Sequence, residues 1–268
     1  MKLSASSKSG GHWYGLDGEK RYGATLIQAR KENLLPSPTE VLKVYSQGGG
    51  LDYWKAKKTA ESGIQLERVE GESDDDYIKR VIRLSDELQS EGRTLGSKVH
   101  NGVENWLARK MWDESCPIMQ RFDQWATDNI RAYEWSEQVL VNPKLGVAGT
   151  ADALLYFKGK AADVCGGGPV LVDWKSQGMK LQTPKTKPAY YKPVFYDKWV
   201  MQLSFYQSCE LVPPPVVSVA INTTEPEEPY LKLWTPEEVA EAFEAFKAAL
   251  KLWQYEKNYQ PNKGGRDE

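Results

Sequence analysis

The spacing of apolar residues changes near Ser136, and this change most limits the folds open to the chain. Before that point Val99, Val103 and Leu107 recur every four residues, which is typical of a helix. After it, short runs of β-branched and aliphatic residues alternate with Asn, Pro and Gly, which is typical of strands and turns. The order of these segments predicts an α/β fold with a mixed central sheet flanked by helices.

Three apolar runs predict strands. Val139 to Val141 and Val147 to Phe157 are separated by residues 142–146, Asn-Pro-Lys-Leu-Gly, which predicts a hairpin. The run from Val170 to Trp174 is short and β-branched and carries its first charge only near its end, so we expect a buried strand. The remaining predicted elements are a helix from Asp197 to Glu210, a strand from Val216 to Ile221 and a closing helix after the capping box Thr235 to Glu238.

The first 93 residues predict an N-terminal helical elaboration. Residues 1–20 have no persistent period and suggest a loosely packed start without chemistry. Short helices are expected from Thr39 to Tyr45 and from Leu51, and the acidic stretch Glu70 to Asp76 is expected to cap the next helix. Helical spacing then covers two separate segments, Tyr77 to Leu88 and Thr94 to Met111. We expect one domain over 1–268, with a core at 94–258 and a disordered tail at 259–268.

Composition excludes several classes of protein. Hydrophobic residues make up 40% of the 268, enough for a core, and no run approaches the ~20 apolar residues that cross a bilayer. The first residues lack the apolar segment of a secretory signal, so we expect a soluble cytoplasmic protein without a membrane partner. Because the net charge is −2, any nucleic-acid site must be a local patch. Three scattered cysteines and two histidines argue against a disulfide framework, a four-thiolate cluster and an imidazole-rich zinc site.

The chemistry centres on the end of the predicted buried strand. Side chains alternate along a strand, so Asp173 and Lys175 share one face while Trp174 points to the other. Asp152 precedes Asp173 by 21 residues, on the strand that we expect to lie beside it. Two carboxylates with open positions suit Mg²⁺ or Mn²⁺. Lys175 is then placed to orient or help deprotonate a water and to offset charge on phosphorus.

Each of these residues also has a simpler reading. Asp-x-Lys alone is more often a salt bridge at the end of a strand. His100 lies one turn before Glu104 on a predicted helix, where a surface histidine is ordinary. Gln202 and Tyr206 are four residues apart, as in a pair at the edge of a core. These alternatives stay open from the residues alone.

Five short motifs follow one another over residues 36–206. They are residues 36–42 (PSPTEVL) with Leu51 and Trp54 downstream, Gly96 to His100 with Glu104, Gly149 to Asp152, Val172 to Ser176, and Gln202 to Tyr206. In type and order they resemble the RecB-like branch of the PD-(D/E)XK nucleases, in particular the mitochondrial genome maintenance exonucleases and their phage-encoded relatives. The resemblance implies the PD-(D/E)XK mixed sheet flanked by helices.

The resemblance also implies roles for individual residues. His100, Asp152 and Asp173 would bind the metal with the carbonyl of Trp174, and Lys175 would be the catalytic lysine. Gln202, Tyr206 and Glu104 would support the site or contact DNA, and Glu137 lies where relatives often have an acidic residue and is a further catalytic candidate.

The chain also departs from parts of this family. Residues 158–169 are longer than in compact relatives, so we expect an extra loop. The similar Cas4 branch binds an iron-sulfur cluster through four cysteines, which three scattered cysteines cannot supply, so no cluster is expected. No G-x-x-x-x-G-K-[ST] sequence occurs, so we expect no ATP, and any motor would be a separate protein.

A basic segment follows the Asp-x-Lys strand. Between Trp174 and Lys198 there are six lysines and one acidic residue, with aromatic residues among them. Ammonium groups that track phosphates and rings that stack on bases suit a single strand, although a flexible surface loop is the competing explanation. Because its prolines prevent a regular helix, we expect an arch or lid over the site. The candidate DNA contacts are Lys180, Lys185, Lys187, Tyr190, Tyr191 and Lys192.

Together these features predict a metal-dependent deoxyribonuclease with water as the nucleophile. We expect an exonuclease that acts at DNA ends, with a single-stranded end as substrate, in recombination, repair or phage genome processing. A phage-encoded enzyme would act in the host cytoplasm, and a separate recombination or single-strand-binding protein is a candidate partner. The alternatives are a structure-specific endonuclease or nickase, and a catalytically silent DNA-binding or assembly protein.

Overall fold

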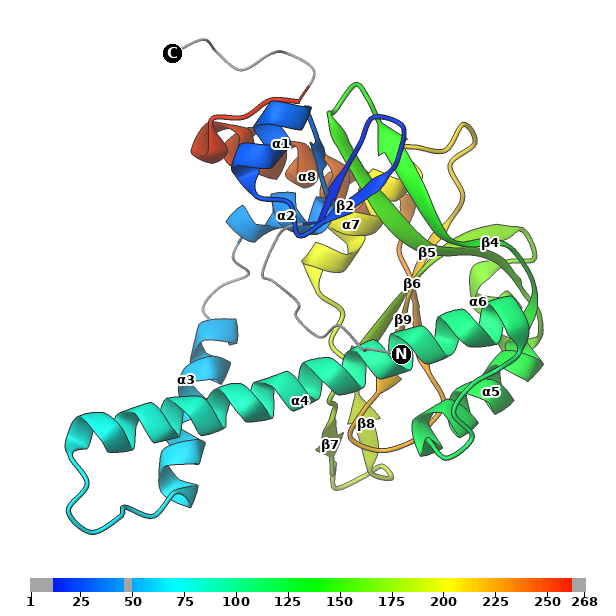
Figure 1. The fold of residues 1–268 in the computed structure, drawn as a ribbon. Coiled ribbons are helices and arrows are strands. Elements are labelled where there is room, and N and C mark those ends of the chain that lie inside the picture. Colours follow the sequence, from blue (N-terminus) through cyan, green and yellow to red (C-terminus); the bar gives the residue numbers. More distant parts are fainter. Residues whose placement is uncertain (1–11, 46–49, 262–268) are drawn as a thin grey trace.

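A computed structural model describes residues 12–45 and 50–261 of the chain (Figure 1). The helices are α1 (Leu26–Glu32), α2 (Pro38–Val41), η1 (Leu42–Val44), α3 (Gly50–Gln65), α4 (Asp74–Arg109), α5 (Pro117–Asn129), α6 (Gly159–Cys165), α7 (Asp197–Gln207) and α8 (Pro236–Lys257). The strands are β1 (His12–Tyr14), β2 (Lys20–Tyr22), β3 (Leu35–Pro36), β4 (Ile130–Asn142), β5 (Val147–Phe157), β6 (Pro169–Gln177), β7 (Lys180–Gln182), β8 (Tyr190–Lys192), β9 (Val216–Asn222) and β10 (Tyr230–Leu233).

The central sheet is mixed, as the sequence predicts. Its strand order is β10-β9-β6-β5-β4, with β6 and β9 parallel and the other neighbours antiparallel. The β4–β5 hairpin turns where Asn, Pro and Gly indicate, and Asn142 Oδ1 accepts a hydrogen bond from the Leu145 amide inside the turn. The strand β4 begins at Ile130, well before the predicted start, because it pairs with the whole length of β5.

Each face of the sheet has its own hydrophobic core. Residues of α7 and α8, such as Phe205 and Trp253, pack with Leu171 on one face. Residues of α4, α5 and α6, such as Val103 and Phe122, pack with the side chain of Trp174 on the other. Side chains alternate along β6, so successive residues enter different cores. The helix α4 crosses the sheet on the face that holds the Trp174 side chain (Figure 1).

The helix α4 is a single element of 36 residues, so the prediction of two separate helices is wrong. The predicted boundary between residues 93 and 94 falls inside it, so the elaboration and the core share one helix. Ser73 caps its start and Asp74, Asp75 and Asp76 occupy its first turn, which confirms the predicted capping role of the acidic stretch.

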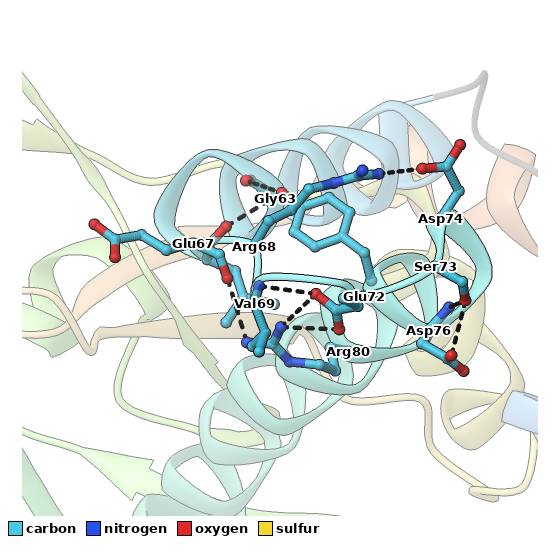
Figure 2. A network of polar contacts seen from close by, with 11 residues as sticks. Gly63, Glu67, Arg68, Val69, Glu72, Ser73, Asp74, Asp76 and Arg80 are labelled. Carbon is cyan, nitrogen blue, oxygen red and sulfur yellow. Dashed lines mark hydrogen bonds and ion pairs between the residues drawn. The ribbon is translucent and has the colours of Figure 1, made fainter.

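The N-terminal half of α4 and α3 form a helical arm beside the body of the molecule (Figure 1). Figure 2 shows the polar contacts that fasten its connecting loop. Arg80 holds Glu72 through two hydrogen bonds, Arg68 bonds Asp74, and the Tyr77 hydroxyl donates to the Gly63 carbonyl. The loop between the two helices is thus ordered by its own side chains.

Both ends of the described chain pack more tightly than the sequence predicts. The strands β1, β2 and β3 form a small sheet in the order β2-β1-β3, and Trp13 and Tyr14 are buried. The expected loose start is therefore wrong for residues 12–20, and the expected purely helical elaboration is wrong for 12–22 and 35–36. At the other end, Tyr259 is buried and its hydroxyl donates to the carbonyls of Ala29 and Leu34, so the expected disorder is wrong there. Residues 1–11 and 262–268 and the side chains of Leu51 and Trp54 lie outside the described residues.

Two connections contain regular secondary structure, in segments where the sequence predicts a loop and an arch or lid. The expected extra loop at 158–169 contains the short helix α6. The lysine-rich segment forms a two-stranded ribbon, β7–β8. Across residues 12–45 and 50–261, no helix combines the length and the apolar character needed to span a bilayer.

Gly149 brings three motifs into contact. A Cβ atom there would lie 2.7 Å from Cδ of Pro38 and 2.9 Å from the hydroxyl of Tyr206. Since neither a proline ring nor a buried tyrosine moves easily, Gly149→Ala is expected to destabilise the fold by about 1–3 kcal/mol. Chemical denaturation measures the effect. Gly168→Ala is the matched control, because a Cβ atom there meets nothing within 4 Å, and equal stability of the two variants would contradict this packing.

Candidate metal centre and active site

The site begins where β5 and β6 separate. Their pairing runs from Tyr156–Pro169 to Ala153–Val172 and ends there, while β6 continues to pair with β9 as far as Gln177. In the gap, Oδ2 of Asp152 accepts a hydrogen bond of 2.8 Å from the backbone N–H of Trp174. A residue in a strand points its N–H and C=O to the same side, so the carbonyl of Trp174 also faces the gap.

Glu137 faces Asp152 across the β4–β5 hairpin. Ser136 pairs with Ala153 and Gln138 pairs with Ala151, so Glu137 and Asp152 occupy opposite positions. Glu137 has φ of 53°, in the left-handed region, although it lies within a strand and is not glycine. Such a backbone costs on the order of 1–3 kcal/mol and is concentrated at functional sites.

His100 reaches the two carboxylates from α4. Its Nε2 lies 3.5 Å from Oδ1 of Asp152 and 3.9 Å from Oε1 of Glu137. One ligand atom from each of the three residues lies within 4.8 Å of the others. Gly96, one turn earlier on α4, permits this approach, because a Cβ atom there would lie 2.8 Å from Oγ of Ser176 on β6. The structure therefore brings His100 and Asp152 together as predicted, with Glu137 as the third member.

Asp173 and Lys175 form an ion pair directly beside this group. Asp173 is 1% exposed, and its Oδ1 accepts a hydrogen bond from Nζ of Lys175. Its Oδ2 is buried without a hydrogen-bond partner among the described residues. The three residues whose ligand atoms lie within 4.8 Å of one another do not include Asp173. The predicted ligand Asp173 therefore lies beside this cluster and not within it. The Trp174 ring lies on the opposite side, 5.6 Å from that of Phe122, as the alternation predicts.

These buried charges shift one another's pKa values. Burial, and then the nearby carboxylate of Asp152, raises the pKa of Glu137 to about 7. Burial likewise raises the pKa of Asp173 to about 7, although Lys175 opposes the shift. Burial would raise the pKa of Asp152 too, but the hydrogen bond with His100 and the charge of Lys175 outweigh it and hold that pKa below its usual value.

The pKa values of the two basic members of the site, His100 and Lys175, also rise. The hydrogen bond with Asp152 raises the pKa of His100, against the effect of burial. Burial lowers the pKa of Lys175, but the charges of Asp173 and Asp152 outweigh burial and the pKa rises. Lys175 is therefore an ammonium group at neutral pH, which suits it to donate hydrogen bonds rather than to accept a proton.

Gln202 and Tyr206 hold the strand that carries Asp152. Nε2 of Gln202 donates to the hydroxyl of Tyr206, which donates a 2.7 Å hydrogen bond to the carbonyl of Thr150. Tyr206 is 3% exposed, so of its two predicted roles the structure favours support of the site over contact with DNA. Tyr14 bonds the same residue through its other backbone group, since its hydroxyl accepts from the Thr150 amide.

The remaining predicted residues surround this centre at different distances. Glu104 is near enough to contribute to the raised pKa of Glu137. The ribbon that carries Lys180, Lys185, Lys187, Tyr190, Tyr191 and Lys192 is tied at its base by two hydrogen bonds between Gln177 and the Val194 backbone. Gln177 is two residues beyond Lys175, so the ribbon starts close to the site. The four lysines of the ribbon are exposed.

Sequence reasoning missed the N-terminal contribution to the site. Tyr14 bonds Thr150, and the charge of Lys20 lowers the pKa of Glu137 against the other effects there. Local spacing carries no signal for these contacts, because they join residues more than a hundred positions apart.

A hard divalent cation fits the donor chemistry of this centre. The donors are one imidazole nitrogen and carboxylate oxygens, and the buried Oδ2 of Asp173 lacks the partner that a buried acceptor requires. This chain matches no protein-family model and no curated protein.

The buried Asp173–Lys175 ion pair leads to a prediction about stability that a double-mutant cycle can test. Lys175→Met leaves Asp173 buried without its cation and is expected to cost about 3 kcal/mol at pH 8. The loss should be smaller at pH 5.5, because Asp173 with its raised pKa is then largely protonated and uncharged. The double variant Asp173→Asn with Lys175→Met should recover most of the loss in urea denaturation. A loss that is equal at both pH values, and that the double variant does not recover, would contradict this view of the pair.

Glu137 is expected to reduce the stability of the metal-free protein. Its pKa is raised from 4.5 in the unfolded chain to about 7, so the folded state loses stability as pH rises from 4.5 to 7 and keeps the full penalty above 7. Glu137→Gln should therefore raise stability at pH 8 in EDTA by on the order of 1–3 kcal/mol, with a gain that shrinks toward pH 5. Glu137→Asn should add a further gain, because asparagine tolerates a left-handed backbone.

Thermal denaturation at the two pH values measures both effects of Glu137. The exposed Glu241→Gln on α8 is the control, with no change expected. If Glu137→Gln were no more stable than wild type at pH 8, the proposed electrostatic penalty would be absent.

Proposed function

We propose that the chain is a metal-dependent nuclease of the PD-(D/E)XK type that hydrolyses phosphodiester bonds of DNA. The observation that carries the proposal is the convergence of His100, Glu137 and Asp152 beside the Asp173–Lys175 pair. These residues come from α4 and three adjacent strands, and structural stability alone gives no reason to collect so many charges there.

His100, Glu137 and Asp152 would hold a Mg²⁺ or Mn²⁺ ion, with Asp173 and the carbonyl of Trp174 as further oxygen donors on the same side. A bound divalent cation supplies positive charge for the oxygens of a phosphate and for a nearby water. Glu137 and Asp152 repel one another without it, so binding relieves a cost that the fold already bears.

Lys175 would act as an electrostatic catalyst. Asp173 holds its Nζ atom, and the raised pKa keeps the group charged. A fixed ammonium group donates hydrogen bonds to the attacking water and to the phosphate oxygens, where negative charge grows in the transition state. Transfer of the proton from water to Lys175 is the less favoured role, because a charged ammonium cannot accept it.

The substrate proposal rests on charge and on the resemblance. The β7–β8 ribbon carries Lys180, Lys185, Lys187 and Lys192, a local positive patch in a chain of net charge −2. Tyr190 and Tyr191 on the same ribbon would stack on bases. Preference for free ends, action in recombination, repair or phage genome processing, a cytoplasmic location and a partner that binds single strands come from the resemblance alone.

Two other functions are open to experiment. A structure-specific endonuclease or nickase would use the same centre, and circular DNA distinguishes it because it has no ends. A DNA-binding or assembly protein without activity is less favoured, because Asp152, Asp173 and Glu137 would repel phosphate without a cation.

A time course on end-labelled DNA tests the proposal. Linear and circular molecules, single- and double-stranded, are incubated with Mg²⁺, Mn²⁺ or EDTA. Metal-dependent loss of linear DNA, with circular DNA intact, is expected for an exonuclease. Cleavage of circular DNA would favour the endonuclease, and no cleavage of any substrate in either metal would contradict the proposed activity.

Asp173→Asn separates catalysis from binding. It removes the charge that holds Lys175 while keeping the shape of the side chain, so metal-dependent cleavage should fall by at least ~100-fold. DNA binding should persist or strengthen, because an anionic group beside phosphate is lost. Asp163→Asn on the exposed face of α6 is the matched control and should keep full activity. Equal activity of Asp173→Asn and wild type in a fluorescent cleavage assay would reject the mechanism.

A further inference from the structure

The β1–β2 hairpin presents a cationic and aromatic face next to the candidate site. His12 pairs with Tyr22 and Tyr14 with Lys20, and directly paired residues of an antiparallel ladder share one face. Trp13 belongs to the other face and is buried in the core. The hairpin therefore turns four side chains, His12, Tyr14, Lys20 and Tyr22, toward one side.

Tyr14 fixes this face to the strand that carries Asp152. Its hydroxyl lies 3.1 Å from Oγ1 of Thr150 and accepts a 3.2 Å hydrogen bond from the Thr150 amide, two residues from Asp152. At the hairpin turn, a Cβ atom on Gly18 would lie 3.4 Å from Cγ1 of Val139, two residues from Glu137. The hairpin is thus attached to both strands of the β4–β5 pair, beside their two acidic residues.

The other three residues of the face are exposed. Tyr22 is 56% exposed, and its ring centroid lies 4.8 Å from that of His12 and 5.9 Å from Nζ of Lys20. Arg21 points to the opposite face and pairs with Glu19, so Lys20 is the cation that the hairpin offers on this side. The charge of Lys20 reaches Glu137, which agrees with a position at the rim of the site.

We propose that this face is a binding site for one nucleotide of a single strand, with the base stacked on Tyr22 and the phosphate bound by Lys20. The inference rests on the proposed nuclease function. It adds a second substrate-binding surface, formed by the N-terminal hairpin, to the one proposed for the β7–β8 ribbon. A base within a duplex is stacked on both faces, whereas the bases of a single strand can stack on a protein ring, so the hairpin favours unpaired DNA at the site. His12 extends the platform by its contact with the Tyr22 ring.

Kinetics on a single-stranded oligonucleotide with Mg²⁺ test the proposal with the full chain. Tyr22→Leu removes the π face and should raise KM by about tenfold with kcat within twofold of wild type, while Tyr22→Phe should behave as wild type. Lys20→Ala should raise KM and lower the salt dependence of binding by about one unit of log–log slope, measured in the Asp173→Asn background. The controls are Tyr255→Ala, at a side chain 86% exposed on α8, and Lys251→Ala on the same helix.

The outcomes separate this inference from the proposed function. If wild type cleaves DNA and both Tyr22→Leu and Lys20→Ala match the two controls, the hairpin does not bind substrate and the inference is overturned. If Tyr22→Phe loses as much as Tyr22→Leu, stacking is not the contact and the inference also fails. If wild type neither cleaves nor binds DNA, the proposed function itself fails. Melting temperatures of all variants confirm that the fold is retained.

Discussion

The hydrogen bond from the Trp174 amide to Asp152 replaces the sheet pairing that ends between β5 and β6. A backbone donor in a sheet interior needs an acceptor, and where the strands separate a carboxylate supplies it. The same bond directs the second oxygen of Asp152 toward His100 and turns the Trp174 carbonyl into the gap. The candidate centre thus follows from one local change in strand pairing.

The features that oppose folding are concentrated at this site. Asp173 is buried as a charged group, and Glu137 combines a left-handed backbone with a carboxylate opposite that of Asp152. Each of these features opposes folding, and each would be offset by a cation or by an anionic substrate bound through that cation. By contrast, the hydrogen bonds that support the site join uncharged groups. Tyr14 accepts a hydrogen bond from the Thr150 amide and Tyr206 donates one to the Thr150 carbonyl, so both backbone groups of this residue, two positions before Asp152, are held while the charges beside it remain unbalanced.

The parts of the structure that the sequence predicts are those with local signals. The hairpin follows from Asn142 to Gly146, the buried strand from Val170 to Trp174, and the closing helix from its capping box. The continuity of α4 was not predictable, because residues 89–93 are polar or glycine and carry no apolar period that would join the two predicted helical segments. Glu137 was a weak candidate, since its place opposite Asp152 depends on the hairpin register. The N-terminal hairpin and Tyr259 were missed because their partners are distant in sequence.

The central claim is that His100, Glu137 and Asp152 bind one divalent cation. Anomalous diffraction from crystals grown with Mn²⁺ tests it most directly. The account predicts a single strong peak about 2.1 Å from a carboxylate oxygen of Asp152, within reach of Nε2 of His100 and the carboxylate of Glu137. Crystals saturated with Mn²⁺ that show no peak among these three residues would contradict it.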